Sequence, residues 1–220
     1  MIKVSEILQV SGDSFTSSNA PTINNGTSNS LVMTTTGYLL ASHLIFTETI
    51  PSHIKRENLI SATLFLRNAS SDTFTEFPDM PPETQSVSIS VSTLDSVISE
   101  TQTTWNNRLT ATPWVTAGHA TSADLQINTT SSETITHYPS IVNMWIPFDV
   151  TLQTQHAIAS DSYNLRIVVR ITTPITSYTY YSSEYSDAAF RPYIKFDLRV
   201  GLPSPVRKGK VRSKISKPSL

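Results

Sequence analysis

Alternation of apolar and polar residues is the main structural signal in this chain. Between residues 60 and 66, 87 and 91, 165 and 171, and 194 and 200, apolar side chains recur at every second position. A period of two places alternate side chains on opposite faces of a strand, so each run predicts a half-buried β-strand. Shorter apolar segments predict further strands at 3–10, 30–35, 38–46, 142–148 and 177–182.

A single segment, residues 149–160, has a helical pattern, and Asp149 or Thr151 can cap its start. Nine or so short strands with polar connections and one short helix are typical of an all-β fold. We therefore predict an antiparallel β-sandwich of the jelly-roll type. We expect this domain to span residues 1–200 and a Pro-containing tail to follow at 201–220.

The composition agrees with this fold class. Ser and Thr make up 62 of the 220 residues, and both form helices poorly, while Thr suits a pleated surface. We expect these hydroxyl residues to cover the exposed faces of the strands. The chain contains no Cys, which excludes disulfides, thiolate zinc sites and thiol nucleophiles. No apolar run approaches the roughly 18 residues of a membrane helix, and residues 1–6 do not resemble a secretory signal.

The net charge of −1 hides an uneven distribution of charge. Residues 1–205 carry 10 basic and 17 acidic residues, whereas the last fifteen residues carry only bases. These are Arg207, Lys208, Lys210, Arg212, Lys214 and Lys217. Such a tail is either solvated, or docked on an acidic protein surface, or in contact with nucleic acid. It has no aromatic residue to stack on bases, which disfavours nucleic acid. We expect the tail to anchor the protein to a partner.

Several short motifs occur in a characteristic order along residues 10–200. They are Gly12-Asp13-Ser14-Phe15, Asn24-Asn25-Gly26, Ser99-Glu100-Thr101-Gln102-Thr103-Thr104-Trp105, Pro147-Phe148-Asp149-Val150-Thr151, Tyr181-Ser182-Ser183-Glu184 and Arg191-Pro192-Tyr193. In this order the set resembles the DNRLRE-type β-sandwich domain, which is related to carbohydrate-binding modules and disaggregatase-associated domains. The resemblance implies binding or scaffolding more often than turnover. The chain departs from the pattern in lacking a tryptophan after Thr151 and in carrying longer polar segments at 68–85 and 117–140.

The resemblance also suggests where ligands would bind. Asp13 lies at a strand entrance where related sandwiches often hold a structural cation, although one carboxylate alone holds Ca²⁺ poorly. We expect no other cofactor. For a glycan-binding platform, the candidate exposed rings are Trp105, Trp114, Tyr178, Tyr180 and Tyr181. A core position with a bonded ring N–H is the competing interpretation of Trp105. Glu184 and Arg191 flank one loop and are candidates for an ion pair.

The sequence offers no catalytic residue. The five histidines do not fall at metal-ligand spacing, and no nucleophile elbow, phosphate-binding loop or dinucleotide fingerprint is present. Paired carboxylates for glycoside hydrolysis depend on the fold and stay open at this point. We therefore expect a protein that is not an enzyme.

Three functions from different classes follow from these patterns. The first is a structural or adhesive virion component, a bacteriophage head-surface or tail protein, made in the host cytoplasm without a signal sequence. Its partners would be other virion proteins or copies of itself, with no membrane and no nucleic acid. The second is a carbohydrate-binding module that recognises surface glycans. The third is a glycan-degrading enzyme, for which no residue can be named.

Overall fold

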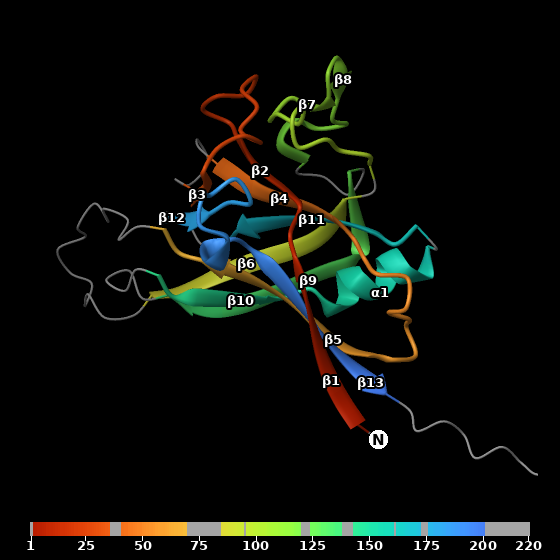
Figure 1. Cartoon of the computed structure of the whole chain (residues 1–220). Coiled ribbons are helices and arrows are strands. Elements are labelled where there is room, and N and C mark those ends of the chain that lie inside the picture. The colour runs from red at the N-terminus through yellow and green to blue at the C-terminus, as the bar shows by residue number, and fades with distance from the viewer. Residues whose placement is uncertain are drawn as a thin grey trace, which may run out of the picture.

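The computed structural model shows two antiparallel β-sheets stacked face to face, with one α-helix at their side (Figure 1). It describes residues 2–35, 41–69, 85–94, 96–119, 124–137, 143–160, 162–172 and 176–200. The predicted all-β sandwich class is confirmed. Among the described residues, no helix has the length and apolar character needed to cross a membrane.

The smaller sheet joins the two ends of the described chain. Its four strands, in spatial order, are β1 (Ile2–Gln9), β13 (Tyr193–Val200), β5 (Leu59–Arg67) and β10 (Trp145–Asp149). β1 lies at one edge, and its register runs from Ile2 opposite Val200 to Gln9 opposite Tyr193. Apolar residues at alternate positions of β13 and β5 point into the sandwich, as the sequence pattern predicts.

The larger sheet has seven strands. Its main path is β12 (Thr176–Tyr181), β3 (Ser30–Thr35), β4 (Ala41–Thr49), β11 (Asn164–Ile171), β6 (Gln85–Leu94) and β9 (Leu125–His137). The seventh strand, β2 (Gly12–Ser17), pairs with β4 beside β3. Every pair of neighbouring strands in this sheet is antiparallel.

One apolar core fills the space between the two sheets. Its largest fully buried side chains include Phe46, Phe148, Phe196, Tyr178 and Tyr180. The helix α1 (Thr151–Ala159) closes one side because it packs against β5 of one sheet and against β9 and β11 of the other. The predicted helix is confirmed, but its N-cap is Val150, which makes no side-chain cap bond, rather than Asp149 or Thr151. The Asp149 carboxylate accepts a bond from the Thr151 N–H just before the helix.

A second layer covers the outer face of the larger sheet. Residues 96–119 form this outer layer, which contains the short strands β7 (Asn107–Leu109) and β8 (Thr112–Pro113). Trp114 of the layer packs with Ile45, Leu94, Leu125 and Val168 in a smaller apolar cluster. The sheet is therefore apolar on both faces where the outer layer covers it.

The outer layer corrects the expectation that hydroxyl residues form the exposed surface. Ser90 and Ser92 alternate with the core residues of β6 and so point away from the main core, yet both are buried. Their hydroxyls are bonded rather than solvated: Arg170 donates to Ser90, and Ser92 shares a bond with Thr130. Some of the Ser and Thr residues therefore lie on a buried polar part of the larger sheet and not on the exposed surface.

Four strands, β2, β7, β8 and β9, lie where the sequence predicts none. β2 was expected only as the entrance to a strand, and β9 occupies the segment 117–140 that the sequence marks as a polar insertion. Both pair through the backbone, to β4 and β6 respectively, and backbone pairing needs no apolar alternation. The other polar segment, 68–85, falls mostly outside the described residues, as does the tail 201–220.

His43 is buried under the outer layer, and this makes stability depend on pH. Its ring lies 5.0 Å from the Trp105 ring, and its Nδ1 is 3.1 Å from the Gly118 carbonyl oxygen. The pKa of His43 is lowered to about 3, mainly by burial and also by the charge of Arg170, while the bond to the Gly118 carbonyl oxygen opposes the shift. The folded state therefore keeps the imidazole neutral while the unfolded chain binds a proton below pH 6.5.

The stability that His43 contributes should be fully present above about pH 6.5 and should be lost as the pH falls toward 3. Between these two pH values the free energy of unfolding should fall by about 1.4 kcal/mol for each pH unit. We expect wild type to lose about 2 kcal/mol more than His43→Gln between pH 6.5 and roughly pH 5, measured by urea unfolding. Parallel pH profiles for the two proteins would contradict the burial of a neutral His43.

Candidate functional site

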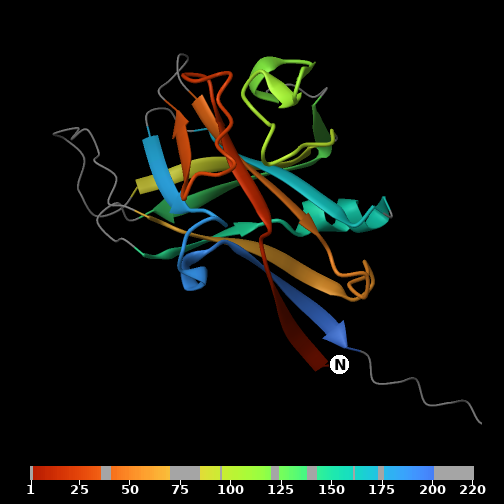
Figure 2. The same ribbon diagram turned by 45° about the horizontal axis from the view of Figure 1, so that its top comes forward.

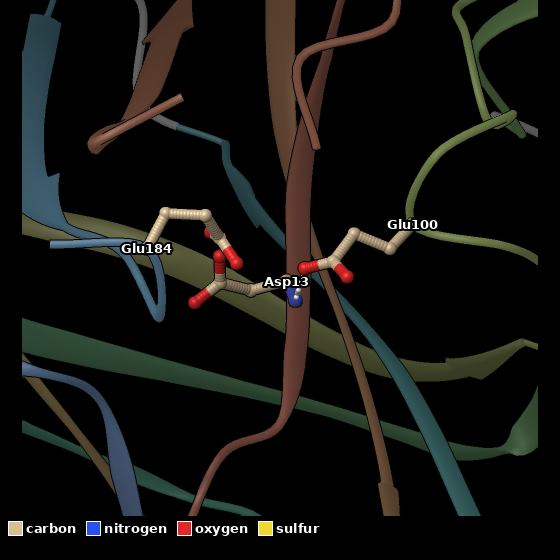
Figure 3. A group of neighbouring side chains, drawn as sticks. All are labelled: Asp13, Glu100 and Glu184. Carbon is tan, nitrogen blue, oxygen red and sulfur yellow. Dashed lines mark hydrogen bonds between the residues drawn. The ribbon is translucent and has the colours of Figure 1, made fainter. Parts of the chain in front are cut away.

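Three carboxylates from distant parts of the chain meet at one point. Asp13 lies in β2, Glu100 in the outer layer, and Glu184 in the turn that follows β12. One carboxylate oxygen from each lies within 4.8 Å of the other two. Figure 3 shows Asp13 between the two glutamates, with all three side chains converging. We refer to Asp13, Glu100 and Glu184 as the carboxylate cluster.

Asp13 forms the buried centre of the cluster. It stands opposite Phe46 in the β2–β4 register, and its residue exposure is 2%. Its Oδ2 accepts a 2.8 Å bond from the Ser183 N–H, while its own N–H donates to Glu100 Oε1 at 2.9 Å. Asp13 thus links β2 directly to both other segments of the cluster.

Two residues between β2 and β3 hold Glu100 in place. The Asn24 side-chain amide donates to the carbonyl oxygens of Glu100 and Thr103, at 2.7 and 2.8 Å. Gly26 lies so close that a Cβ there would be far inside contact distance of the Glu100 carbonyl group and 2.7 Å from its Cγ. Only glycine lets the two backbones approach in this way.

The turn after β12 positions Glu184. The Ser182 hydroxyl donates to the Ser28 carbonyl oxygen at 2.6 Å, which ties the turn to the chain before β3. The next hydroxyl, that of Ser183, donates to Glu184 Oε1 at 2.8 Å. The ion pair expected between Glu184 and Arg191 is not formed, because Arg191 Nε donates to the Tyr185 carbonyl oxygen instead.

The electrostatic environment of the cluster disfavours negative charge. The pKa of Asp13 is raised to about 8: burial is the largest cause, the charges of Glu184 and Glu100 add to the rise, and the bonds from Ser183 oppose it. Burial likewise raises the pKa of Glu100, with Glu184 adding to the rise. None of the ion pairs within the described part of the chain reaches these three residues.

This arrangement can hold protons or a cation. Oxygen-only carboxylate sites suit hard divalent ions, and crowded carboxylates can also share protons. A small cavity beside the cluster, lined by Asp13, Ile45, Ile98 and Glu100 among others, has room for about one water molecule. This cavity is too small for a sugar ring.

The expected glycan platform is wrong for three of its five rings. Trp114, Tyr178 and Tyr180 are buried, at exposures of 4%, 0% and 0%. Trp114 Nε1 donates to the Thr104 carbonyl oxygen at 2.9 Å inside the outer layer. Tyr178 and Tyr180 point into the main core, and the Tyr180 ring meets Phe148 edge-on. These rings cannot stack on a sugar.

The other two rings are half-buried in separate places. Trp105 packs on His43, and Gly118, which has a φ of 75°, lies against its ring. Tyr181 contacts Tyr185 and Phe190 at the opposite side of β12 from the core. The five predicted rings therefore do not form one surface.

A different group of rings does lie together on the outer face of the smaller sheet. Phe65 and Tyr193 are cross-strand partners whose rings stack at 4.9 Å, and Trp145 meets Tyr193 edge-on at the same distance. We call Phe65, Trp145 and Tyr193 the ring cluster. All three are half-buried, and Arg67 lies over the Trp145 ring. Their positions on the polar phase of three alternating strands are the sequence signal that could have found them.

Comparison with known proteins adds no family to this geometry. No protein-family model matches the chain, and a search of curated proteins found no match either. The resemblance to the DNRLRE-type domain therefore stays a prediction. The predicted anchor residues Arg207, Lys208, Lys210, Arg212, Lys214 and Lys217 lie outside the described residues.

Proposed function

We propose that this chain is a non-enzymatic structural or adhesive component of a virus particle, a bacteriophage head-surface or tail protein. In this proposal it attaches to its assembly at the end of the body where β1 and β13 run together. The observation that carries the proposal is an exposed apolar edge next to the start of the basic tail.

The edge consists of β1 and the end of β13. Ile2, Val4 and Val200 lie on one face of this edge and Ile7 lies on the other, with exposures of 55%, 44%, 45% and 65%. β1 is the outermost strand of the smaller sheet among the described residues, so one side of its backbone is open to pairing. Figures 1 and 2 both show β1 and β13 extending together away from the rest of the sandwich. We call these four residues the apolar edge.

Exposed apolar residues on an open strand are features of interaction sites, because they gain most when another chain covers them. The predicted tail 201–220 follows Val200 in the sequence and carries six basic residues from Arg207 to Lys217. Together the two elements provide two linked contacts, and linked contacts raise the strength of attachment well above that of either alone. The partner of this surface would be another virion protein or a second copy of the chain.

Incorporation into particles tests the proposal. We expect a tagged chain produced during infection to co-purify with particles, and both deletion of 206–220 and Ile7→Lys to reduce its occupancy strongly. Val115→Lys is the matched control because Val115 is 73% exposed in the outer layer, far from the apolar edge in sequence. Raised ionic strength should release the tail contact and leave the apolar contact. Unchanged occupancy in both variants would contradict the proposed attachment.

A carbohydrate-binding module is the second candidate, and the ring cluster favours it. Aromatic faces on the outside of a sheet can stack on the apolar faces of sugar rings, and Arg67 supplies hydrogen-bond donors beside them. On a glycan array we expect hits that disappear in Trp145→Ala while the variant stays folded by circular dichroism. A blank array for wild type would argue against this candidate and leave the structural proposal.

A further inference from the structure

We propose that Asp13, Glu100 and Glu184 together bind one divalent cation, and that this cation is of the Ca²⁺ class. The first observation is the approach of three carboxylate oxygens to within 4.8 Å of one another. Ca²⁺ lies 2.3–2.6 Å from its oxygen ligands, so two oxygens on the same ion are at most about 5 Å apart. Ca²⁺ accepts several carboxylates in a flexible coordination shell, whereas Mg²⁺ demands near-ideal octahedral geometry and usually takes only one or two, so a site of three carboxylates favours the larger ion.

The second observation is independent of the clustering and concerns unsatisfied oxygens. Only 2% of the surface of Asp13 is exposed, and its Oδ1 has no hydrogen-bond partner among the described residues. Glu184 Oε2 is also buried and has no partner there. Buried carboxylate oxygens without a donor are costly, and they are found where a ligand completes them. Both orphaned atoms belong to side chains that point into the cluster (Figure 3).

The electrostatics favour a cation over a neutral ligand. The site holds up to three negative charges. Among the described residues, no Lys, Arg or His forms an ion pair with these carboxylates. Burial strengthens the repulsion between the carboxylates. Glu100 and Glu184 are half-exposed, so an ion can enter from their side and keep water as its remaining ligands. The alternative is that the carboxyl groups share protons and bind no ion.

A bound ion would also join parts of the chain that no disulfide can join. Asp13 and Glu100 are 87 residues apart, and the Asp13 side chain reaches Ser183, 170 residues away. The ion would therefore fasten β2, the outer layer and the turn after β12 to one another. Because binding favours the folded state only, added ion should raise the unfolding temperature.

Calorimetric titration and thermal unfolding of the full chain test the proposal. After chelator treatment, Ca²⁺ should bind at one ion per chain, with saturating Ca²⁺ raising Tm by roughly 5 °C or more. Asp13→Asn keeps an oxygen for the Ser183 N–H but removes the charge, so its affinity should fall at least about tenfold. Glu57→Gln makes the same charge change at an exposed site and should bind as wild type does.

Each outcome decides between the ion and shared protons. If wild type shows neither binding heat nor a Tm shift with Ca²⁺, the carboxyl groups share protons and the proposal is overturned. Equal affinity in Asp13→Asn and wild type would also overturn it. Should Asp13→Asn not fold, Glu184→Gln, in a half-exposed turn, carries the same expectation of about tenfold weaker binding. A Tm shift with Mg²⁺ as large as with Ca²⁺ would overturn the assignment to the larger ion.

Discussion

Gly26→Ala should destabilise the protein by roughly 3 kcal/mol or more, among the largest effects of any single methyl group in this chain. A Cβ at this position would overlap the Glu100 carbonyl oxygen and carbonyl carbon, and would lie 2.7 Å from Glu100 Cγ. Backbone atoms cannot rotate away as a side chain can. Relief requires the chain around Glu100 to move, and the bonds from Asn24 to the Glu100 and Thr103 carbonyls hold that chain in place.

Urea unfolding of two single variants, Gly26→Ala and the control Gly12→Ala, measures this effect. At Gly12 the nearest atom to a new Cβ is the Thr47 Cγ2 methyl at 2.8 Å, so a side chain rather than a backbone has to give way. We expect the Gly12 variant to lose clearly less stability than the Gly26 variant. Equal losses in the two variants would show that the contact between Gly26 and Glu100 is not as tight as described.

Trp114→Ala should cost roughly 3–5 kcal/mol of stability, as expected for the removal of a buried aromatic ring. The ring fills the smaller apolar cluster beneath the outer layer, with 4% exposure, and its Nε1–H is bonded to the Thr104 carbonyl oxygen. The substitution leaves a cavity and an unbonded carbonyl group. Trp114→Phe should cost less, because it keeps part of the ring volume while losing the hydrogen bond.

The same variant separates two roles for this tryptophan. A ring that stacked on sugar from the surface could be removed at a cost within about 0.5 kcal/mol. Denaturant unfolding of Trp114→Ala, followed by circular dichroism, therefore distinguishes a core ring from a platform ring without any glycan. A loss below about 1 kcal/mol would contradict its place in the smaller apolar cluster.

The strands that the sequence predicts well are those with strong apolar alternation. β11 and β13 lie within one residue of their predicted bounds because their inward residues are Leu, Ile, Val and Phe. β3, which a shorter apolar segment predicts, has the predicted bounds, with Leu31 and Met33 in the core. β9 was missed because Thr and Ser occupy both phases of its central part, which leaves no period of two to detect. Its pairing with β6 is a property of two backbones in register and is visible only in three dimensions.

The site was predictable to a smaller extent. The sequence indicates Asp13 as a metal ligand, whereas Glu184 is predicted only as an ion-pair partner of Arg191 and Glu100 stands in a motif of the family resemblance with no role of its own. Nothing in a sequence indicates that positions 87 residues apart meet, because that distance is set by how β2 and the outer layer pack. Tyr178 and Tyr180 are two residues apart, a spacing that places both rings on one face of β12, but the sequence does not show that this is the core face.

The pairing of β1 with β13 has a consequence for the order in which the molecule folds. Ile2 stands opposite Val200, so the smaller sheet joins residues almost 200 positions apart. β1 cannot find its partner until nearly the whole described chain has left the ribosome. Contacts between such distant residues form slowly because a very long loop must close first. Until then the apolar residues of β1 have no sheet to join, and during synthesis the nascent N-terminal segment is the part most in need of protection from aggregation.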